Sequence, residues 1–239
     1  MPSRSDAHVG ARSLRGVIFD LDGTLADTHE MAIGLIGESI ERFGGPRLGP
    51  SELIALFGPN EQGIFRGVLG DRWEEAWGYY LGEYVDRHRE CPAPFPGIID
   101  LVGSLRETGA RLGVITGKTE TTGRMSLDVL GLSPYFPDLR GGAIEGIVKR
   151  ADIAAMVSGW GLGLGAVGYV GDTVTDVIEA KAAGVVAIAA CWSSYADVAS
   201  LGAADPDLIF SDVTELAHWL TPHRSEGQSA PRTSTARKE

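Results

Sequence analysis

An apolar segment near the start of the chain ends in two carboxylates that stand one residue apart. Residues 17–25 read VIFDLDGTL, and this run of β-branched and aromatic residues predicts a strand buried on both faces, as in a parallel sheet. Asp20 and Asp22 then follow the strand at its carboxyl end, where open α/β sheets bind ligands. Both side chains point the same way and repel each other unless a cation or a proton compensates. An ordinary acidic turn is the alternative interpretation, because Asp and Gly are common turn residues.

A second apolar segment, residues 111–118, ends in a hydroxyl, a glycine and a cation. Thr116 can donate its O–H to an anion, and the Gly117 N–H can approach an anion closely because glycine has no Cβ. Lys118 follows as a further candidate for contact with phosphate or substrate. Thr-Gly pairs are also common turn sequences, so this segment gains its meaning from the others.

A third apolar segment, residues 166–172, ends in another carboxylate, Asp172. Asp176 lies one helical turn further on, so both carboxylates can face the same point if a helix begins between them. The alternative is that Asp172 or Thr173 simply caps that helix. Lys149 follows a Gly-rich segment, and taken alone it would be an ordinary surface lysine.

Taken together, these groups suit phosphoryl transfer. Closely spaced carboxylates hold Mg²⁺, which offsets the negative charge of both a nucleophile and a phosphate. A hydroxyl, a backbone N–H and a lysine can hold the remaining phosphoryl oxygens, and such positioning supplies most of the catalysis. We therefore expect a Mg²⁺ site at the strand ends, with Thr116, Gly117 and Lys149 binding the phosphate.

The order of these motifs resembles that of the haloacid dehalogenase-like hydrolase superfamily. D-x-D-G-T stands at 20–24, a strand-end threonine and a lysine follow, and G-D-x-x-x-D stands at 171–176. The resemblance covers residues 15–220 and implies an α/β fold, a Rossmann-like parallel sheet with helices on both faces. The alternation of helical and strand patterns agrees with such a sheet, with an irregular stretch at 135–146 and a helix at 151–160.

The resemblance also implies roles for single residues. Asp20 would be the nucleophile that forms an aspartyl-phosphate. Asp22 would be the general acid/base and would give its backbone carbonyl to Mg²⁺. Asp172 would bind the metal, and Asp176 would support it directly or through water. The strand-end threonine and the lysine would bind the transferring phosphoryl group.

Two details of the sequence bear on these roles. In the family the lysine is often followed by proline in a K-P-x-P pattern, whereas residues 149–152 read KRAD. Arg150 is therefore an alternative phosphate ligand. Dehalogenases usually lack the second aspartate, but a phosphate ester needs it because its leaving oxygen must be protonated. Asp22 therefore favours a phosphatase or a phosphomutase over a dehalogenase.

A helical segment follows the first strand directly. Residues 28–91 have apolar side chains at helical spacing, and we interpret the aromatic stripe at 73–84 as packing. The insert resembles the small helical cap of the subgroup that contains phosphoglycolate phosphatases and β-phosphoglucomutases. The expected organisation is a disordered arm at 1–13, a core domain at 14–26 and 94–221, a cap domain at 27–93 and a disordered tail at 222–239.

We expect the cap to close over the metal, to exclude water and to select a small phosphorylated metabolite. Residues 57–64 form a polar, Gly/Pro-rich turn between two cap helices. Asn60, Glu61 or Arg66 would contact the leaving group of the substrate there. The alternative is that Asn60 is the N-cap of a cap helix.

The composition is that of an ordinary enzyme, with 239 residues, a hydrophobic fraction of 44% and a net charge of −11. The charge disfavours nucleic-acid binding, which needs a basic face. No apolar run is long enough to cross a bilayer, and the first 13 residues lack the apolar region of a signal peptide. The two cysteines, Cys91 and Cys191, give no disulfide framework. We expect a cytoplasmic monomer or homodimer.

Three hypotheses about function follow. The leading one is a Mg²⁺-dependent phosphatase for a small phosphate monoester, with phosphoglycolate as the nearest example from the family. A phosphomutase of the β-phosphoglucomutase type would use the same aspartyl-phosphate but protect it from water. The third is a protein that binds phosphorylated metabolites without turnover. The grouped aspartates disfavour the third hypothesis, because carboxylates are costly to bring together without a metal.

Overall fold

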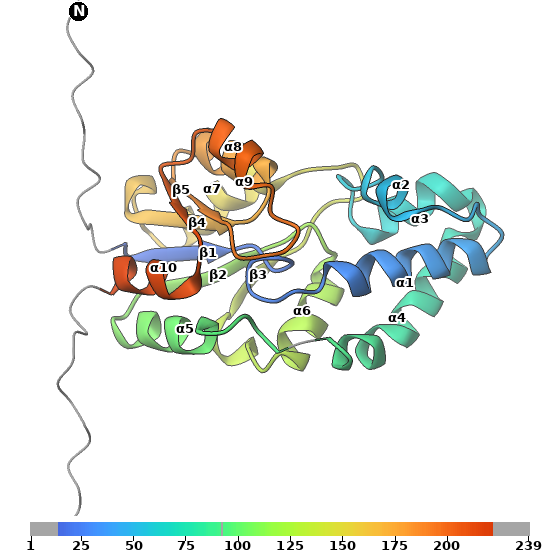
Figure 1. Ribbon diagram of the computed structural model, residues 1–239, viewed down its shortest axis with the longest axis horizontal. Coiled ribbons are helices and arrows are strands. Elements are labelled where there is room, and N and C mark those ends of the chain that lie inside the picture. The colour runs from blue at the N-terminus through green and yellow to red at the C-terminus, as the bar shows by residue number, and fades with distance from the viewer. Residues whose placement is uncertain (1–13, 92, 222–239) are drawn as a thin grey trace, which may run out of the picture.

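Six parallel strands form one sheet in the order β3-β2-β1-β4-β5-β6. The computed structural model describes residues 14–91 and 93–221, so the predictions for 1–13 and 222–239 lie outside the described residues. The strands are β1 (Gly16–Phe19), β2 (Arg111–Ile115), β3 (Asp138–Arg140), β4 (Val167–Gly171), β5 (Val186–Ala190) and β6 (Leu208–Phe210). Helices cover both faces of this sheet (Figure 1), which confirms the predicted α/β fold.

The central strand β1 shows how the two faces are covered. Its side chains alternate, so that Val17 and Phe19 join one apolar cluster and Ile18 joins the other. The first cluster contains residues of α5 (Ile98–Glu107), α6 (Glu120–Val129) and α10 (Val213–Leu220). The second contains residues of α7 (Lys149–Gly159), α8 (Val174–Ala183) and α9 (Val198–Ala203). A strand buried on both sides is what the unbroken apolar run predicts.

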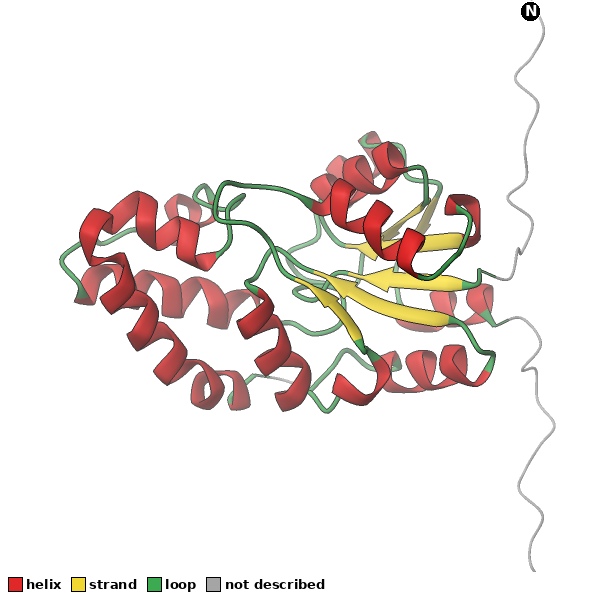
Figure 2. Cartoon of the chain, turned by 180° about the vertical axis from the view of Figure 1, so that it is seen from behind, coloured by secondary structure: helices red, strands yellow, loops and turns green. Residues whose placement is uncertain are grey.

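Helices α1 to α4 lie together beyond the carboxyl ends of the strands, which point toward them (Figure 2). They are α1 (His29–Arg42), α2 (Pro50–Ile54), α3 (Glu61–Leu69) and α4 (Trp73–Arg89). They share a third apolar cluster, in which Phe65, Tyr80 and Tyr84 are fully buried. This group of helices is called the cap below. The aromatic stripe of the sequence therefore packs, as predicted, although the exact domain boundaries stay a prediction.

Several elements differ from the expectation. The stretch expected to be irregular contains β3, a strand with one buried apolar residue, Leu139, that pairs with β2. Its sequence gives no local strand signal, because the pairing with β2 defines it. The helix expected at 151–160 begins two residues earlier, at Lys149. Helices α9 and α10 have no counterpart in the predicted elements. Three short 3-10 turns complete the described structure: η1 (Gly70–Arg72), η2 (Ser133–Tyr135) and η3 (Leu164–Ala166).

Among the described residues, every helix is too short or too polar to cross a membrane.

Candidate active site

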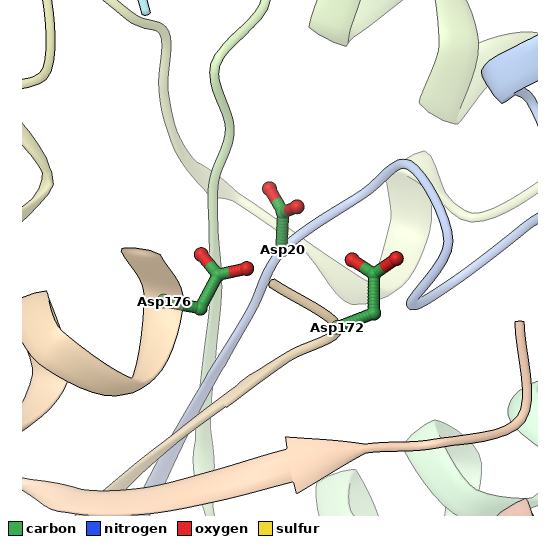
Figure 3. A group of neighbouring side chains, drawn as sticks. All are labelled: Asp20, Asp172 and Asp176. Atoms are coloured by element: carbon green, nitrogen blue, oxygen red, sulfur yellow. The ribbon is translucent and has the colours of Figure 1, made fainter. Parts of the chain in front are cut away.

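Three aspartates gather at the carboxyl ends of the two neighbouring strands β1 and β4. Asp20 follows β1, and its N–H donates to the carbonyl of Val170 in β4 (2.8 Å). Asp172 follows β4, and Asp176 lies in the first turn of α8. One carboxylate oxygen from each lies within 4.8 Å of the others, and Figure 3 shows all three side chains directed into the same space. The sequence pattern predicted that these aspartates lie close together, because the carboxyl ends of neighbouring parallel strands lie at the same edge of a sheet.

The cluster is buried and negatively charged. Burial, opposed in part by Lys149, raises the pKa of Asp20 to about 7. Burial and the charges of Asp20 and Asp176 raise the pKa of Asp172 to about 9. Oδ1 of Asp20 is buried and has no hydrogen-bond partner. A divalent cation is the simplest group that would compensate such carboxylates, and oxygen ligands of this kind suit Mg²⁺.

Asp176 takes part both in the N-terminal capping of α8 and in the aspartate cluster. The interpretation that Thr173 caps this helix is confirmed. Thr173 is the N-cap of α8, and Oδ2 of Asp176 accepts from its N–H (3.0 Å) and its hydroxyl (2.6 Å). Oδ1 of Asp176 accepts from Nζ of Lys149 (2.6 Å) and from the Tyr169 hydroxyl (3.1 Å). A carboxylate has about four acceptor positions, and these four bonds use them.

Lys149 is the first residue of α7, and its ammonium reaches the aspartate cluster. Nζ lies 3.2 Å from Oδ1 of Asp20 and 2.6 Å from Oδ1 of Asp176. The Lys149 side chain is only 12% exposed. Burial lowers the pKa of Lys149, but Asp176 and Asp20 outweigh burial and hold it well above its ordinary value. Arg150 is exposed, and its backbone N–H donates to Glu179. The structure therefore brings Lys149 into the cluster and leaves Arg150 outside it.

Asp22 is held by groups from two other segments. The Thr28 hydroxyl donates to Oδ1 of Asp22, and Nζ of Lys118 lies 3.3 Å from the same atom. Burial raises the pKa of Asp22, but Lys118, His29 and Thr28 outweigh burial, so that the pKa lies below its ordinary value. Gly23 (φ +74°) turns the chain here, and a Cβ at this position would meet Oδ2 of Asp172 at 2.0 Å. Only glycine fits this turn.

Thr116 and Gly117 follow β2 at the next strand end. The Thr116 N–H donates to the carbonyl of Arg140 in β3 (3.1 Å), so the unpredicted strand fixes this position. The Thr116 hydroxyl accepts from the N–H of Lys118 (3.3 Å), which leaves its own hydrogen free to donate. A Cβ at Gly117 would meet open space, so no protein atom blocks the approach of a ligand on that side.

A cavity of about 230 Å³ lies between the strand ends and the cap. Pockets for drug-sized ligands have roughly 300–1,000 Å³, so this volume suits a small metabolite. Residues of both parts line the cavity: Asp20, Asp22, Gly117, Lys118, Ile147, Lys149, Thr173 and Thr175 from the core, and His29, Ala32, Ile36, Phe57, Gly58, Pro59, Glu61 and Ile64 from the cap.

The three cap residues singled out in the sequence have different positions. Asn60 is the N-cap of α3, accepting from the Gly63 N–H (3.0 Å), and its Nδ2 donates to the carbonyl of Gly142 (2.7 Å). The capping interpretation of Asn60 is therefore confirmed. Glu61 is buried and lines the cavity. Arg66 is exposed and is not among the lining residues. Contact of these residues with a leaving group stays a prediction.

Comparison with known proteins decides the family. Residues 17–190 match the family model described as haloacid dehalogenase-like hydrolase. The chain is a haloacid dehalogenase-like hydrolase. The match confirms the resemblance that the motifs indicated, and it confirms the prediction that the protein is an enzyme.

The hydrolase is similar to named phosphatases at low identity. The phosphoglycolate phosphatase of Rhodospirillum rubrum is 32% identical over 228 residues, covering 86% of this chain and 90% of that protein. The pyrophosphatase PpaX of Bacillus velezensis is 23% identical and covers 87% of this chain and 96% of its own. A haloacid dehalogenase-like hydrolase structure from Streptococcus pneumoniae is similar with a TM-score of 0.70 and 25% identity. The match covers 87% of this chain and 98% of that structure. The hydrolase thus belongs among phosphatase-like members of its family.

Some residues of the site had no predicted role. The Thr24 hydroxyl donates to Oδ1 of Asp172 (3.4 Å). Thr24 is the last residue of the D-x-D-G-T motif, so the motif could have indicated that it belongs to the site. Tyr169 donates to Asp176, but in the sequence it is simply one aromatic residue of a buried strand. The His29 ring stacks on Tyr195 with centroids 4.8 Å apart, and no local pattern joins two residues so far apart in the chain.

Proposed function

We propose that the hydrolase is a Mg²⁺-dependent phosphatase that acts on a small phosphate monoester through an aspartyl-phosphate on Asp20. The observation that carries the proposal is the position of Asp20. Its carboxylate lines the cavity, lies beside Lys149 and two other aspartates, and keeps one buried oxygen without a hydrogen bond. This oxygen is Oδ1, which forms an ion pair with Lys149 (3.2 Å) but is not hydrogen-bonded to any described residue, so it can attack phosphorus beside a group that holds the phosphate.

The donor set fits a divalent cation. Four aspartates (Asp20, Asp22, Asp172 and Asp176) face two lysines (Lys118 and Lys149), which leaves two negative charges uncompensated when all are ionised. Asp20, Asp172 and the Asp22 carbonyl would hold Mg²⁺, which supplies charge neutralisation between the carboxylate and the phosphate. Because the oxygens of Asp176 already accept four hydrogen bonds, Asp176 would support the site through Lys149 and α8.

The chemistry then proceeds in two displacements. An oxygen of Asp20 attacks the phosphorus atom, the bond to the ester oxygen breaks, and the leaving oxygen takes a proton from Asp22. A water molecule then gives its proton to Asp22 and attacks the phosphorus, which releases inorganic phosphate and restores Asp20. Lys149, the Thr116 hydroxyl and the Gly117 N–H would hold the other phosphoryl oxygens during both steps.

The environment of Asp22 suits a group that gains and loses a proton. In the ligand-free site Lys118 holds Asp22 ionised. A phosphate dianion arriving beside it raises its affinity for a proton, as any nearby like charge does. After the ester bond breaks, ionised Asp22 is again the form that accepts the proton of water.

The experiment is phosphate release from a panel of small phosphate esters, together with the anhydride pyrophosphate, with and without Mg²⁺. The panel includes phosphoglycolate and pyrophosphate, because the relatives are named for them. We expect metal-dependent release that falls by about 10⁴-fold or more in Asp20→Asn, which keeps the shape but not the nucleophile. The control is Asp100→Asn, which changes an exposed aspartate of α5 and should retain full activity.

Two results would contradict the proposal. Full activity of Asp20→Asn would exclude Asp20 as the nucleophile. Isomerisation of a sugar phosphate with a bisphosphate primer, without net phosphate release, would identify a phosphomutase instead. Compartment and oligomeric state stay predictions.

A further inference from the structure

The cap side of the cavity is mostly apolar, in contrast to the core side. Most of its lining side chains share this character: Ala32, Ile36, Phe57, Pro59 and Ile64. The polar exceptions are Glu61 and His29, and burial lowers the pKa of His29, which favours its neutral form. Ile147 of the core lines the same cavity, and Phe57 and Ile147 are 43% and 53% exposed. Large apolar side chains that stay exposed around a binding cavity indicate an apolar ligand surface.

The cations of the cavity are already paired with carboxylates. Lys149 contacts Asp20 and Asp176, and Lys118 contacts Asp22. Among the residues that the structure describes, no arginine lines the cavity. A substrate with a second anionic group would therefore find, among the described lining residues, no lysine that is free of a carboxylate partner.

Glu61 adds a carboxylate to the cap side and covers the N-terminus of α6. The N-terminus of α6, a helix of ten residues, would attract an anion through its free N–H groups. Oε2 of Glu61 accepts from the N–H of Thr119 (2.6 Å), and Oε1 accepts from the hydroxyl of Thr122 (2.7 Å). The protein's own carboxylate thus takes the position that a carboxylate of a substrate could use.

We infer that the substrate is a phosphate monoester whose leaving group is uncharged and largely apolar, and that Glu61 disfavours esters with a second anionic group. The inference rests on the proposed function and narrows it. Phosphoglycolate and pyrophosphate both carry such a second anion, whereas a short alkyl or aryl phosphate does not. Repulsion by Glu61 and the loss of apolar contact act in the same direction against the charged esters.

The first test compares two esters of similar size, propyl phosphate and phosphoglycolate, with the wild-type enzyme and Mg²⁺. We expect kcat/KM for propyl phosphate to be higher by about tenfold or more, the scale on which a binding pocket rejects a mismatched group. Equal or higher kcat/KM for phosphoglycolate overturns the inference and leaves the proposed function standing. Failure to hydrolyse any ester of the panel ends the proposed function and the inference with it.

The second test is Glu61→Gln, which removes the charge. The Gln oxygen can accept from the Thr119 N–H while its amide donates to the Thr122 hydroxyl, because a hydroxyl can turn to accept. We expect the ratio of kcat/KM for propyl phosphate to kcat/KM for phosphoglycolate to fall by about tenfold, because the Glu61 charge no longer repels the carboxylate of phosphoglycolate. Glu74→Gln, an exposed glutamate of α4, is the matched control and should keep the wild-type ratio. An unchanged ratio in Glu61→Gln overturns the role given to Glu61.

Discussion

The two walls of the cavity are built from different kinds of residue. The core wall presents charged groups at strand ends, with Asp20 and Asp22 beside Lys149 and Lys118. The cap wall presents mostly aliphatic and aromatic side chains from helices and from the loop before α3. It also contains His29, and Glu61 is its one carboxylate among the described lining residues. If the proposed function holds, this difference separates two tasks: the core wall would carry the reaction, and the cap wall would select the leaving group.

The walls also differ in how their charges are held. On the core wall each lysine contacts at least one carboxylate of the same wall, Lys149 with Asp20 and Asp176 and Lys118 with Asp22, so the charges depend on one another. On the cap wall the Glu61 carboxylate accepts from a backbone N–H and a hydroxyl at the start of α6. Lys118 acts on it through its charge. Changes on the core wall should therefore affect catalysis strongly, and changes on the cap wall should alter selectivity.

The largest effect is expected on the core wall. Lys149→Met removes the ammonium between Asp20 and Asp176, and kcat should fall about 10²–10³-fold, the usual loss for one electrostatic contact to the transition state. The matched control is Arg150→Met, which changes the neighbouring exposed cation and should leave kcat within about twofold. Steady-state kinetics on the best ester of the panel measures both. A greater loss of kcat in Arg150→Met than in Lys149→Met would assign the phosphate contact to Arg150 instead of Lys149.

Metal binding should stabilise the core wall. Mg²⁺ at 100 times its Kd should raise the free energy of unfolding by about 2.7 kcal/mol, because it binds the folded state. Asp172→Asn should lose this gain, and Asp100→Asn should keep it. Thermal denaturation with Mg²⁺ and with EDTA gives the comparison. The same Mg²⁺ gain in Asp172→Asn would show that the metal binds elsewhere.

A smaller effect, and one on KM, is expected on the cap wall. Phe57→Ala should raise KM for propyl phosphate about fivefold with little change in kcat, because it removes part of an apolar contact. Ile54→Ala is the control, since Ile54 is 44% exposed, as Phe57 is 43%, but does not line the cavity. If both variants change KM equally, the apolar wall has no part in selection.

The smallest effects concern two buried tyrosine hydroxyls of α4, one of which bonds to the core. The hydroxyls of Tyr84 in α4 and Ser126 in α6 share a buried hydrogen bond of 2.7 Å, whereas the buried Tyr80 hydroxyl has no hydrogen bond to any residue that the structure describes. Tyr84→Phe should lower the free energy of unfolding by about 1 kcal/mol, and Tyr80→Phe should raise it by about 1 kcal/mol. Urea denaturation of the two variants provides the measurement. Shifts of the same sign would argue against this hydrogen-bond assignment.

The core wall was predicted from the sequence in large part. Asp20 and Asp172 each follow an apolar strand, and the helical spacing to Asp176 is local, so simple periodicity brings the three together. Lys149 was a weaker prediction because it follows the loop between β3 and α7, and no local rule fixes where such a loop ends. Its place in the cluster depends on the start of α7, which lies two residues before the predicted helix.

The cap wall was predicted less well. Asn60 and Glu61 stand in a recognisable helix start, but their partners Gly142 and Thr119 lie in distant loops of the core. No pattern in the sequence joins these segments, so the sequence left open whether Glu61 meets a substrate or the protein. Arg66 has the charge that suits an anionic substrate, yet the helical turn places it on the exposed side of α3.

The sequence by itself determined the kind and order of most elements, with β3, α9 and α10 as the exceptions, and which strands end in charged residues. These properties depend on periodicity and on neighbouring residues, which a single chain displays directly. Only the tertiary structure decided which charges pair: Lys149 with Asp176, Lys118 with Asp22, and Glu61 with the start of α6. Such pairs form between segments distant in the chain, and their distances are set by how helices and strands pack, which no local pattern encodes.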